Sequence, residues 1–176
     1  LDGTGLPQDA SAQTTAHLVD ADGVEVSVVA STYGRPFVHL PERRAAMAVD
    51  GDPTTAWSTA EGSDPLGEEL VVSDTGGTLR LVQPATIGGA PVNRHITEIE
   101  VSTGASTFTV ALDDRSLSAT GQAIDLPPGT TAVTLRITAV SEPSGDATPS
   151  GVGFAELGLA RGELSEVVCL PDIDRK

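Results

Sequence analysis

The stretch with the clearest capacity for chemistry runs from Met47 to Trp57 and reads MAVDGDPTTAW. It holds two carboxylates, Asp50 and Asp52, two threonine hydroxyls and the only tryptophan of the chain. An Asp-Gly-Asp-Pro turn presents side-chain and main-chain oxygens, which are the ligands that hard cations such as calcium prefer. The residue types and their spacing therefore predict a loop ordered by a metal ion. The alternative is an ordinary acidic turn that binds nothing.

This loop does not follow the EF-hand pattern. With Asp50 at position 1, Asp52 falls at position 3 and Glu61 at position 12, but Thr55 occupies position 6. The EF-hand requires glycine there for its sharp turn. The flanking sequence also lacks the pattern of two long helices, so a calcium ion would need a different frame.

Other metal and catalytic chemistry finds little support in the sequence. The single cysteine, Cys169, and the histidines His17, His39 and His95 lack the spacing of zinc ligands. None of these histidines stands in a recognisable nucleophile context. The Gly-Gly pairs at 76–77 and 88–89 precede no Lys-Ser pair, as a phosphate-binding loop would require. We therefore predict a protein that is not itself an enzyme.

Composition narrows the class of protein and its partners. The chain has 176 residues, a net charge of −15, 19 glycines and 12 prolines, and only 3% aromatic residues. This mixture favours one domain of short strands with an aliphatic core. The acidic surface repels nucleic acid and anionic lipid, and no apolar run reaches the roughly 20 residues of a membrane span. Because the chain begins at Leu1 and its one methionine is Met47, we expect a piece of a longer or processed protein.

Alternating apolar and polar residues predict an antiparallel β-sandwich. We expect an irregular lead-in or linker over 1–21, the sandwich over 22–160, and an exit linker over 161–176. One or two helical turns are expected over 41–47, and the strands that flank residues 74–77 are expected to form a hairpin. The predicted strands cover residues 24 to about 30, 70–72, 79–82, 96–101, 108–112, 124–126, 133–140 and 151–160.

Glu156 stands out in the last of these strands, which is otherwise apolar. A carboxylate is costly to bury without a partner. We therefore expect Glu156 either to face water or to hold a cation or a hydrogen-bond donor.

Three motifs together, Ala30-Ser31, Ala48 to Trp57 and Gly153 to Leu157, resemble the discoidin-like domains of coagulation factors and related bacterial carbohydrate-binding modules. The resemblance spans about residues 22–160 and implies the galactose-binding-like fold, an antiparallel jelly-roll β-sandwich. It implies that Trp57 is a packing residue. It also implies a structural calcium held by main-chain or side-chain oxygens of Met47, Asp50, Asp52, Thr55, Ala155 and Glu156.

A second resemblance concerns the parent protein. Nine arginines against one lysine, the Phe154 to Leu157 segment and the following Glu166 to Pro171 resemble the extracytoplasmic part of actinobacterial cell-wall arabinofuranosyltransferases. This implies an accessory module of a large membrane enzyme, located outside the cytoplasm with neighbouring domains around it. The sequence departs from animal discoidin domains, because a lone Cys169 cannot form their disulfide and no set of bulky apolar loop residues is present.

The function expected from these observations is recognition of an arabinan-type or galactan-type glycan, without catalysis or membrane insertion. Aromatic faces cover sugar C–H surfaces, and arginine or histidine donors bind hydroxyls. Two alternatives remain open: a structural or protein-interaction module that braces a neighbouring domain, and an enzyme in its own right. The candidate glycan-binding residues are Tyr33, Arg35, Phe37 and His39 in one loop and Arg94 and His95 in another; each could instead simply fill its loop.

Overall fold

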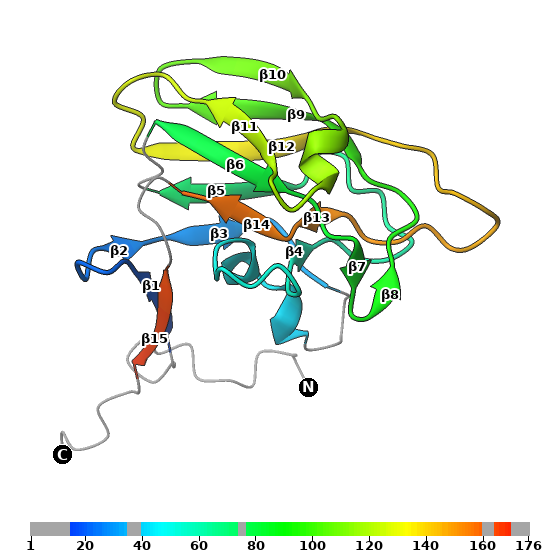
Figure 1. The fold of residues 1–176 in the computed structure, drawn as a ribbon, viewed down its shortest axis with the longest axis horizontal. Coiled ribbons are helices and arrows are strands. Elements are labelled where there is room, and N and C mark those ends of the chain that lie inside the picture. Colours follow the sequence, from blue (N-terminus) through cyan, green and yellow to red (C-terminus); the bar gives the residue numbers. More distant parts are fainter. Residues whose placement is uncertain (1–14, 35–39, 74–76, 160–163, 170–176) are drawn as a thin grey trace, which may run out of the picture.

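The computed structural model describes residues 15–34, 40–73, 77–159 and 164–169, and its regular secondary structure consists mainly of antiparallel strands (Figure 1). The strands are β1 Thr15–Val19, β2 Glu25–Val26, β3 Val28–Ala30, β4 Trp57–Ser58, β5 Glu69–Ser73, β6 Thr78–Val82, β7 Thr86–Ile87, β8 Ala90–Pro91, β9 Ile96–Thr103, β10 Thr107–Ala111, β11 Gln122–Asp125, β12 Ala132–Val140, β13 Gly153–Phe154, β14 Glu156–Gly158 and β15 Ser165–Cys169. Among the described residues, three short 3-10 helices accompany them: η2 Pro41–Arg43, η3 Ala45–Ala48 and η4 Asp114–Leu117.

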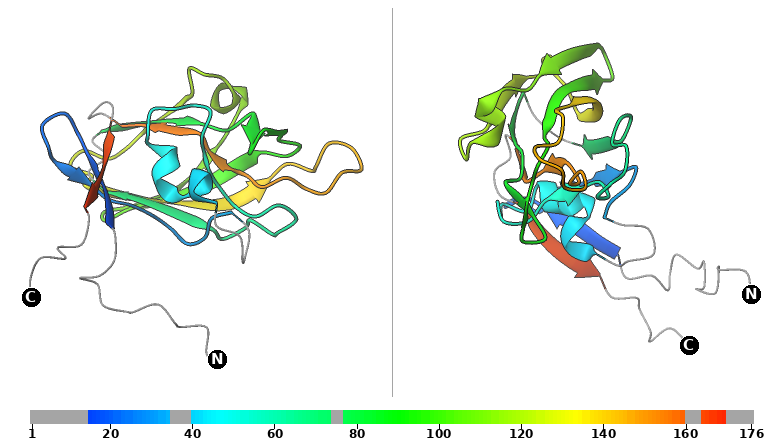
Figure 2. Two further views of the ribbon diagram at one scale, coloured as in Figure 1. Left: turned by 90° about the horizontal axis from the view of Figure 1, so that it is seen from below. Right: turned by 90° about the vertical axis from the view of Figure 1, so that its right-hand side faces the viewer.

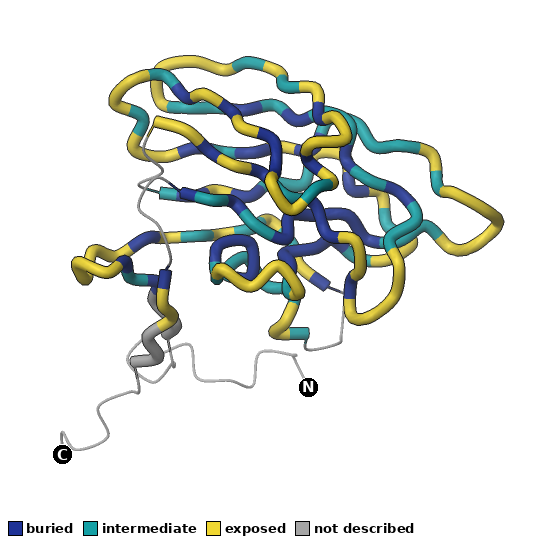
Figure 3. Tube along the Cα trace, in the orientation of Figure 1, coloured by how far each residue is buried: buried dark blue, intermediate teal, exposed yellow. Residues whose placement is uncertain are grey.

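Two sheets form the sandwich. One has five strands in the order β10-β9-β12-β5-β3, and the other has three in the order β11-β6-β14. Alternate residues of both sheets point into one hydrophobic core, as the period of two along a strand requires. Leu70 and Val72 on β5 are fully buried, as are Leu79 and Leu81 on β6. Figure 3 shows the buried positions along the strands and the exposed positions mostly in the loops. The predicted all-β sandwich is confirmed.

Trp57 is the largest side chain of this core and has 0% exposure. Its ring centroid lies 5.4 Å from that of Phe154, and its indole Nε1 donates a hydrogen bond of 2.8 Å to the carbonyl oxygen of Thr32. The strands that carry the two rings, β4 and β13, are paired with each other. Trp57 is therefore a packing residue, as the sequence predicted. It fixes the C-terminal end of the loop over residues 49–56, the Asp50 loop.

The helical turns expected over 41–47 are present as the consecutive 3-10 helices η2 and η3. Pro41 lies at the first position of η2, where a missing N–H costs nothing. Met47 and Ala48 of η3 are buried, and η3 contacts β3, β4 and β14. This packing fixes the position at which the Asp50 loop begins.

The predicted hairpin between β5 and β6 is wrong. β5 belongs to the five-stranded sheet and β6 to the three-stranded sheet, so the connection crosses from one layer to the other. Both strands show the same alternation because each buries one face in the shared core. A turn signal between two such strands does not reveal whether the chain folds back in one sheet or crosses to the other.

The irregular terminal segments were also predicted incorrectly in part. β1 and β15 pair along their whole length, from Thr15 opposite Cys169 to Val19 opposite Ser165, and Figure 2 shows the two strands side by side at one end of the molecule. Each is stabilised by a partner at the far end of the sequence, which a local pattern cannot reveal. The domain boundaries at residues 22 and 160 stay a prediction.

The expected strand over 151–160 is two strands. β13 pairs with β4, whereas β14 pairs with β6, so the chain changes partner at Ala155. Within the described residues, no helix has the length and apolar character needed to cross a bilayer.

We predict that Trp57→Phe lowers the free energy of unfolding by about 2 kcal/mol, because it removes the bond to Thr32 and leaves a cavity beside Phe154. Urea denaturation followed by circular dichroism measures this loss. Tyr33→Phe is the control, because the Tyr33 side chain is 44% exposed and exposed positions usually change stability by less than about 0.5 kcal/mol. Equal stability of the two variants would contradict the packing role.

Candidate functional site

The Asp50 loop is closed by its own carboxylates. Asp50 Oδ1 accepts from the backbone N–H of Asp52 at 3.0 Å, and Oδ2 accepts from the hydroxyl of Thr55 at 2.8 Å. The carbonyl of Asp52 accepts from the backbone N–H of Thr55 at 3.1 Å. Two hydrogen bonds from Thr54, one from its hydroxyl and one from its backbone, lower the pKa of Asp52. The oxygens of Asp50, Asp52 and Thr55 are thus gathered in one tight turn.

Glu156 reaches this turn from β14. Its Oε2 accepts a hydrogen bond of 3.0 Å from the backbone N–H of Gly51, a residue 105 positions earlier. The side chain is half-buried. The structure therefore brings together the two distant segments that the sequence singled out, and it gives Glu156 one of the partners expected for it, a hydrogen-bond donor.

Burial raises the pKa of Glu156 to about 7, and the nearby negative charge of Asp50 adds to this effect. Hydrogen bonds from the backbone N–H groups of Gly51 and Leu157 oppose it, because they favour the ionised carboxylate. Two carboxylates close together with too little positive charge between them repel each other. A cation placed there would relieve this repulsion.

The donor chemistry of the loop fits calcium. Calcium takes carboxylate, carbonyl and hydroxyl oxygens. The Thr55 hydroxyl donates to the Asp50 carboxylate, and the Glu156 carboxylate accepts from the N–H of Gly51, the residue after Asp50. No three acidic, histidine or cysteine side chains of the described part of the chain group as metal ligands. A calcium ion would therefore rely on main-chain oxygens as well. The two further residues assigned by resemblance, Met47 and Ala155, are both buried.

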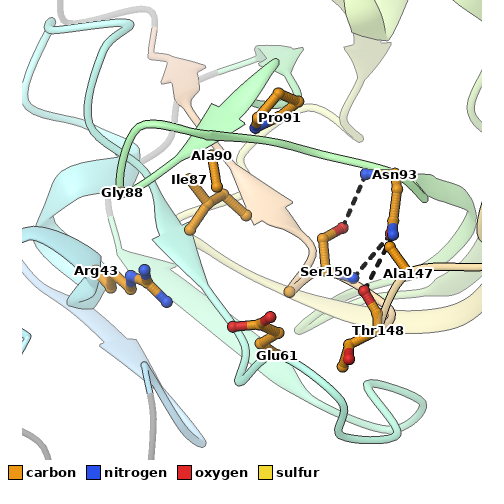
Figure 4. A pocket seen from close by; sticks show the side chains of 11 residues that line it. Arg43, Glu61, Ile87, Gly88, Ala90, Pro91, Asn93, Ala147, Thr148 and Ser150 are labelled. Atoms are coloured by element: carbon orange, nitrogen blue, oxygen red, sulfur yellow. Dashed lines mark hydrogen bonds between the residues drawn. The ribbon is translucent and has the colours of Figure 1, made fainter.

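A pocket of about 400 Å³ is lined in part by residues of β7 and β8 (Figure 4). In Figure 1 these two strands lie on the opposite side of the molecule from β1 and β15. Figure 4 shows Arg43 entering from one side, Asn93, Thr148 and Ser150 on the other, and the carboxylate of Glu61 on the Arg43 side. The pocket thus combines a cation, a carboxylate and an amide with an apolar edge. Its lining residues are Arg43, Glu61, Ile87, Gly88, Ala90, Pro91, Asn93, Ala147, Thr148, Ser150 and Gly151.

Asn93 ties one wall of the pocket to the loop over 141–150. Its Nδ2 donates to the carbonyl of Thr148 at 3.0 Å, and its Oδ1 accepts from the backbone N–H of Ser150 at 2.8 Å. Its backbone N–H donates to the Ser150 hydroxyl at 3.1 Å. An amide group carries two N–H donors, and among the described residues Nδ2 has only the Thr148 carbonyl as an acceptor.

Arg94, the next residue, is buried behind the same wall of the pocket. It is only 7% exposed, and its guanidinium donates to the carbonyl oxygens of Ser150 at 2.7 Å and Ser63 at 2.8 Å. Burial lowers the pKa of Arg94, and the charge of Asp64 partly offsets this. The guanidinium joins two loops and is absent from the pocket lining.

The structure gives no evidence on the binding roles of the other residues predicted to bind a glycan. Tyr33 is exposed. His95 is half-buried, with its Nδ1 3.4 Å from the hydroxyl of Ser141. Arg35, Phe37 and His39 lie outside the described residues. The binding roles of all these residues stay predictions.

Sequence reasoning missed the polar residues that line the pocket. Arg43, Glu61 and Asn93 come from three separate segments, and no local motif joins them. The only signal was indirect: Asn93 immediately precedes the Arg94-His95 pair that drew attention.

Comparison with known proteins rests on structure alone, because no protein-family model matches the chain and no curated protein matches its sequence. One similar structure is the arabinofuranosyltransferase AftD from Mycobacteria, with 20% identity and a TM-score of 0.63; the match covers 98% of this chain but 13% of AftD. Another is the family 32 carbohydrate-binding module of Clostridium perfringens NanJ, solved with galactose. It has 14% identity and a TM-score of 0.53, covering 87% of this chain and 100% of the module.

A third is a family 32 module, CpGH89CBM32-5 from Clostridium perfringens, solved with GalNAc-β-1,3-galactose. It has 21% identity and a TM-score of 0.50, covering 75% of this chain and 92% of that one. The chain thus shares the β-sandwich fold of these modules. This confirms the discoidin-like β-sandwich predicted from the motifs, and the chain spans about one eighth of the AftD length.

The ionisation of Glu156 predicts how the stability of this chain depends on pH. The unfolded chain releases the proton near pH 4.3, but the folded chain keeps it to about pH 7. Between these values the folded state binds more protons, so stability falls as pH rises. Without metal, wild type should lose about 1–2 kcal/mol relative to Glu156→Gln from pH 4.3 to 8, after allowance for solvent screening.

Urea denaturation in a chelator at several pH values measures this difference. Glu142→Gln is the control, because Glu142 is an exposed carboxylate in the 141–150 loop. Parallel pH profiles for wild type and Glu156→Gln would refute the assignment of the titrating group.

Proposed function

We propose that the chain is a non-catalytic carbohydrate-binding module and that the pocket lined by Arg43, Glu61 and Asn93 is its ligand site. The observation that carries this proposal is the chemistry of the pocket wall. Sugar hydroxyls both donate and accept hydrogen bonds, and the pocket offers a guanidinium donor, a carboxylate acceptor and an amide hydrogen.

The shape of the pocket supports the same class of ligand. Its volume of about 400 Å³ lies in the usual range for small-molecule sites, roughly 300–1,000 Å³. Ile87, Ala90 and Pro91 give it an apolar edge that can cover the C–H face of a sugar ring. We expect weak binding, with a Kd between about 1 µM and 1 mM.

The proposed setting is the cell surface, as an accessory module of a larger membrane-associated arabinofuranosyltransferase. The structural match to AftD over 98% of this chain supports it, together with the arginine-rich, lysine-poor composition. In that setting the glycan would be of the arabinan or galactan type, and the neighbouring domains would belong to the same parent chain.

We also propose a structural calcium in the Asp50 loop. Asp50, Asp52, Thr55 and Glu156 would hold it, with main-chain oxygens of the buried Met47 and Ala155 completing the shell. Bound calcium would supply the positive charge that the carboxylate pair lacks. The role of these residues is to fix the turn beside Trp57.

A bracing function is the second candidate. On the outer face of the five-stranded sheet, Val29 and Val71 stand opposite each other on β3 and β5, with 58% and 37% of their surfaces exposed. Exposed valines in register favour contact with another protein surface.

We predict that arabinan and galactan fragments shift the amide resonances around the pocket when titrated into the labelled protein in calcium. Arg43→Gln should weaken binding at least tenfold, because it removes a charged donor. Arg115→Gln is the matched control, since Arg115 is exposed and paired with Asp113 on η4. Shifts centred outside the pocket would refute the pocket as the sugar site, and no shifts at millimolar sugar would favour bracing.

We predict that calcium raises the melting temperature of wild type but not of Asp50→Asn. At 100 times the Kd, binding to the folded state alone adds about 2.7 kcal/mol, or roughly 5–10 °C for a domain of this size. Asp146→Asn, at an exposed loop residue, should respond as wild type does. Equal calcium responses in Asp50→Asn and wild type would remove the metal site.

A further inference from the structure

The turn between β7 and β8 consists of Gly88 and Gly89. Both residues have positive φ, +59° and +79°, and the strands that they join pair Ile87 with Ala90 and Thr86 with Pro91. Two consecutive residues at positive φ are typical of the tight two-residue hairpin turn, in which glycine carries no steric cost. The turn therefore requires a positive φ at both glycines.

Their surroundings differ. A Cβ on Gly88 would lie 2.5 Å from Nη2 of Arg43 and 3.6 Å from its Cζ, whereas a Cβ on Gly89 would meet nothing within 4 Å. The guanidinium of Arg43 therefore occupies the room that a side chain on Gly88 would take. Because the contact is with the end of a flexible side chain, a substitution there would displace the guanidinium and leave the backbone in place.

The Nε atom of Arg43 is held in place by packing and not by a hydrogen bond. This atom is buried and has no hydrogen-bond partner among the described residues, a costly state that a structure tolerates only for a reason. Arg43, Ile87 and Gly88 also line a second cavity of about 80 Å³, which adjoins Thr54 and Thr55 of the Asp50 loop. Arg43 thus forms a wall shared by this small cavity and the larger pocket.

We propose, on the basis of the glycan-binding function above, that Gly88 is a positioning residue that sets the specificity of the pocket. By lacking a side chain, it lets the Arg43 guanidinium stand where its donors meet two neighbouring hydroxyls of a neutral sugar. The net charge of −15 favours a neutral sugar over a uronic acid, whose carboxylate the surface repels.

The test compares Gly88→Ala with Gly89→Ala. Both variants place alanine at positive φ, so they should lose similar amounts of thermal stability, but only Gly88→Ala meets Arg43. In NMR titrations with arabinobiose and galactose, Gly88→Ala should bind at least tenfold more weakly than wild type, and Gly89→Ala within twofold. Galacturonic acid should bind wild type at least tenfold more weakly than galactose. Gly88→Asn is a second variant, because asparagine tolerates positive φ.

A readout without ligand separates this inference from the proposed function. The Nε–H resonance of Arg43, assigned by its loss in Arg43→Lys, should shift in Gly88→Ala and stay in place in Gly89→Ala. If wild type binds no sugar but this resonance shifts, the glycan function fails and the positioning role of Gly88 stands.

The converse outcome overturns the inference alone. If wild type binds sugar, and Gly88→Ala and Gly89→Ala bind it equally well, the function stands and Gly88 does not position Arg43. Equal or tighter binding of galacturonic acid than of galactose would overturn the assignment of a neutral ligand.

Discussion

The structure depends on a close main-chain contact between residues 57–59 and 151–154. A Cβ on Gly153 would lie 1.8 Å from the carbonyl oxygen of Trp57, and one on Gly151 would lie 2.3 Å from that of Thr59. Only glycine permits so close an approach of two backbones. The N–H of Thr59 also donates to the carbonyl of Val152 at 2.9 Å. This seam lets the rings of Trp57 and Phe154 pack together inside.

Both candidate sites are positioned by this seam. On one side, the Asp50 loop ends at Trp57, and Glu156 follows Phe154 by two residues, so the pairing of β4 with β13 brings the carboxylates together. On the other side, the pocket walls that contain Glu61 and Gly151 continue from the same two segments. The raised pKa of Glu156 is thus a consequence of packing that the core enforces.

Much of the fold and part of the site could be predicted from the sequence. The long strands β9 and β12 follow a clear alternation because each buries one face, and the ordered motifs placed Glu156 beside the Asp50 loop. The β1–β15 pair could not be predicted, since its partners are distant in sequence. Arg94 was predicted to bind sugar because its guanidinium can donate to hydroxyls. The structure buries it against two carbonyl acceptors, an environment that no local pattern reveals, and its binding role stays a prediction. The pocket could not be predicted, because its lining comes from segments whose relative positions only the fold reveals.

The pairing of β1 with β15 has a mechanical consequence. Thr15, where β1 begins, lies opposite Cys169, where β15 ends, so tension applied to these two residues pulls across the ladder rather than along it. Hydrogen bonds loaded in this way break sequentially, and they break at lower force than bonds that are sheared simultaneously. The Arg44–Glu166 ion pair joins β15 to the segment between η2 and η3. The β15-β1-β2 sheet would therefore separate first under tension, while the sandwich with its two candidate sites stays folded.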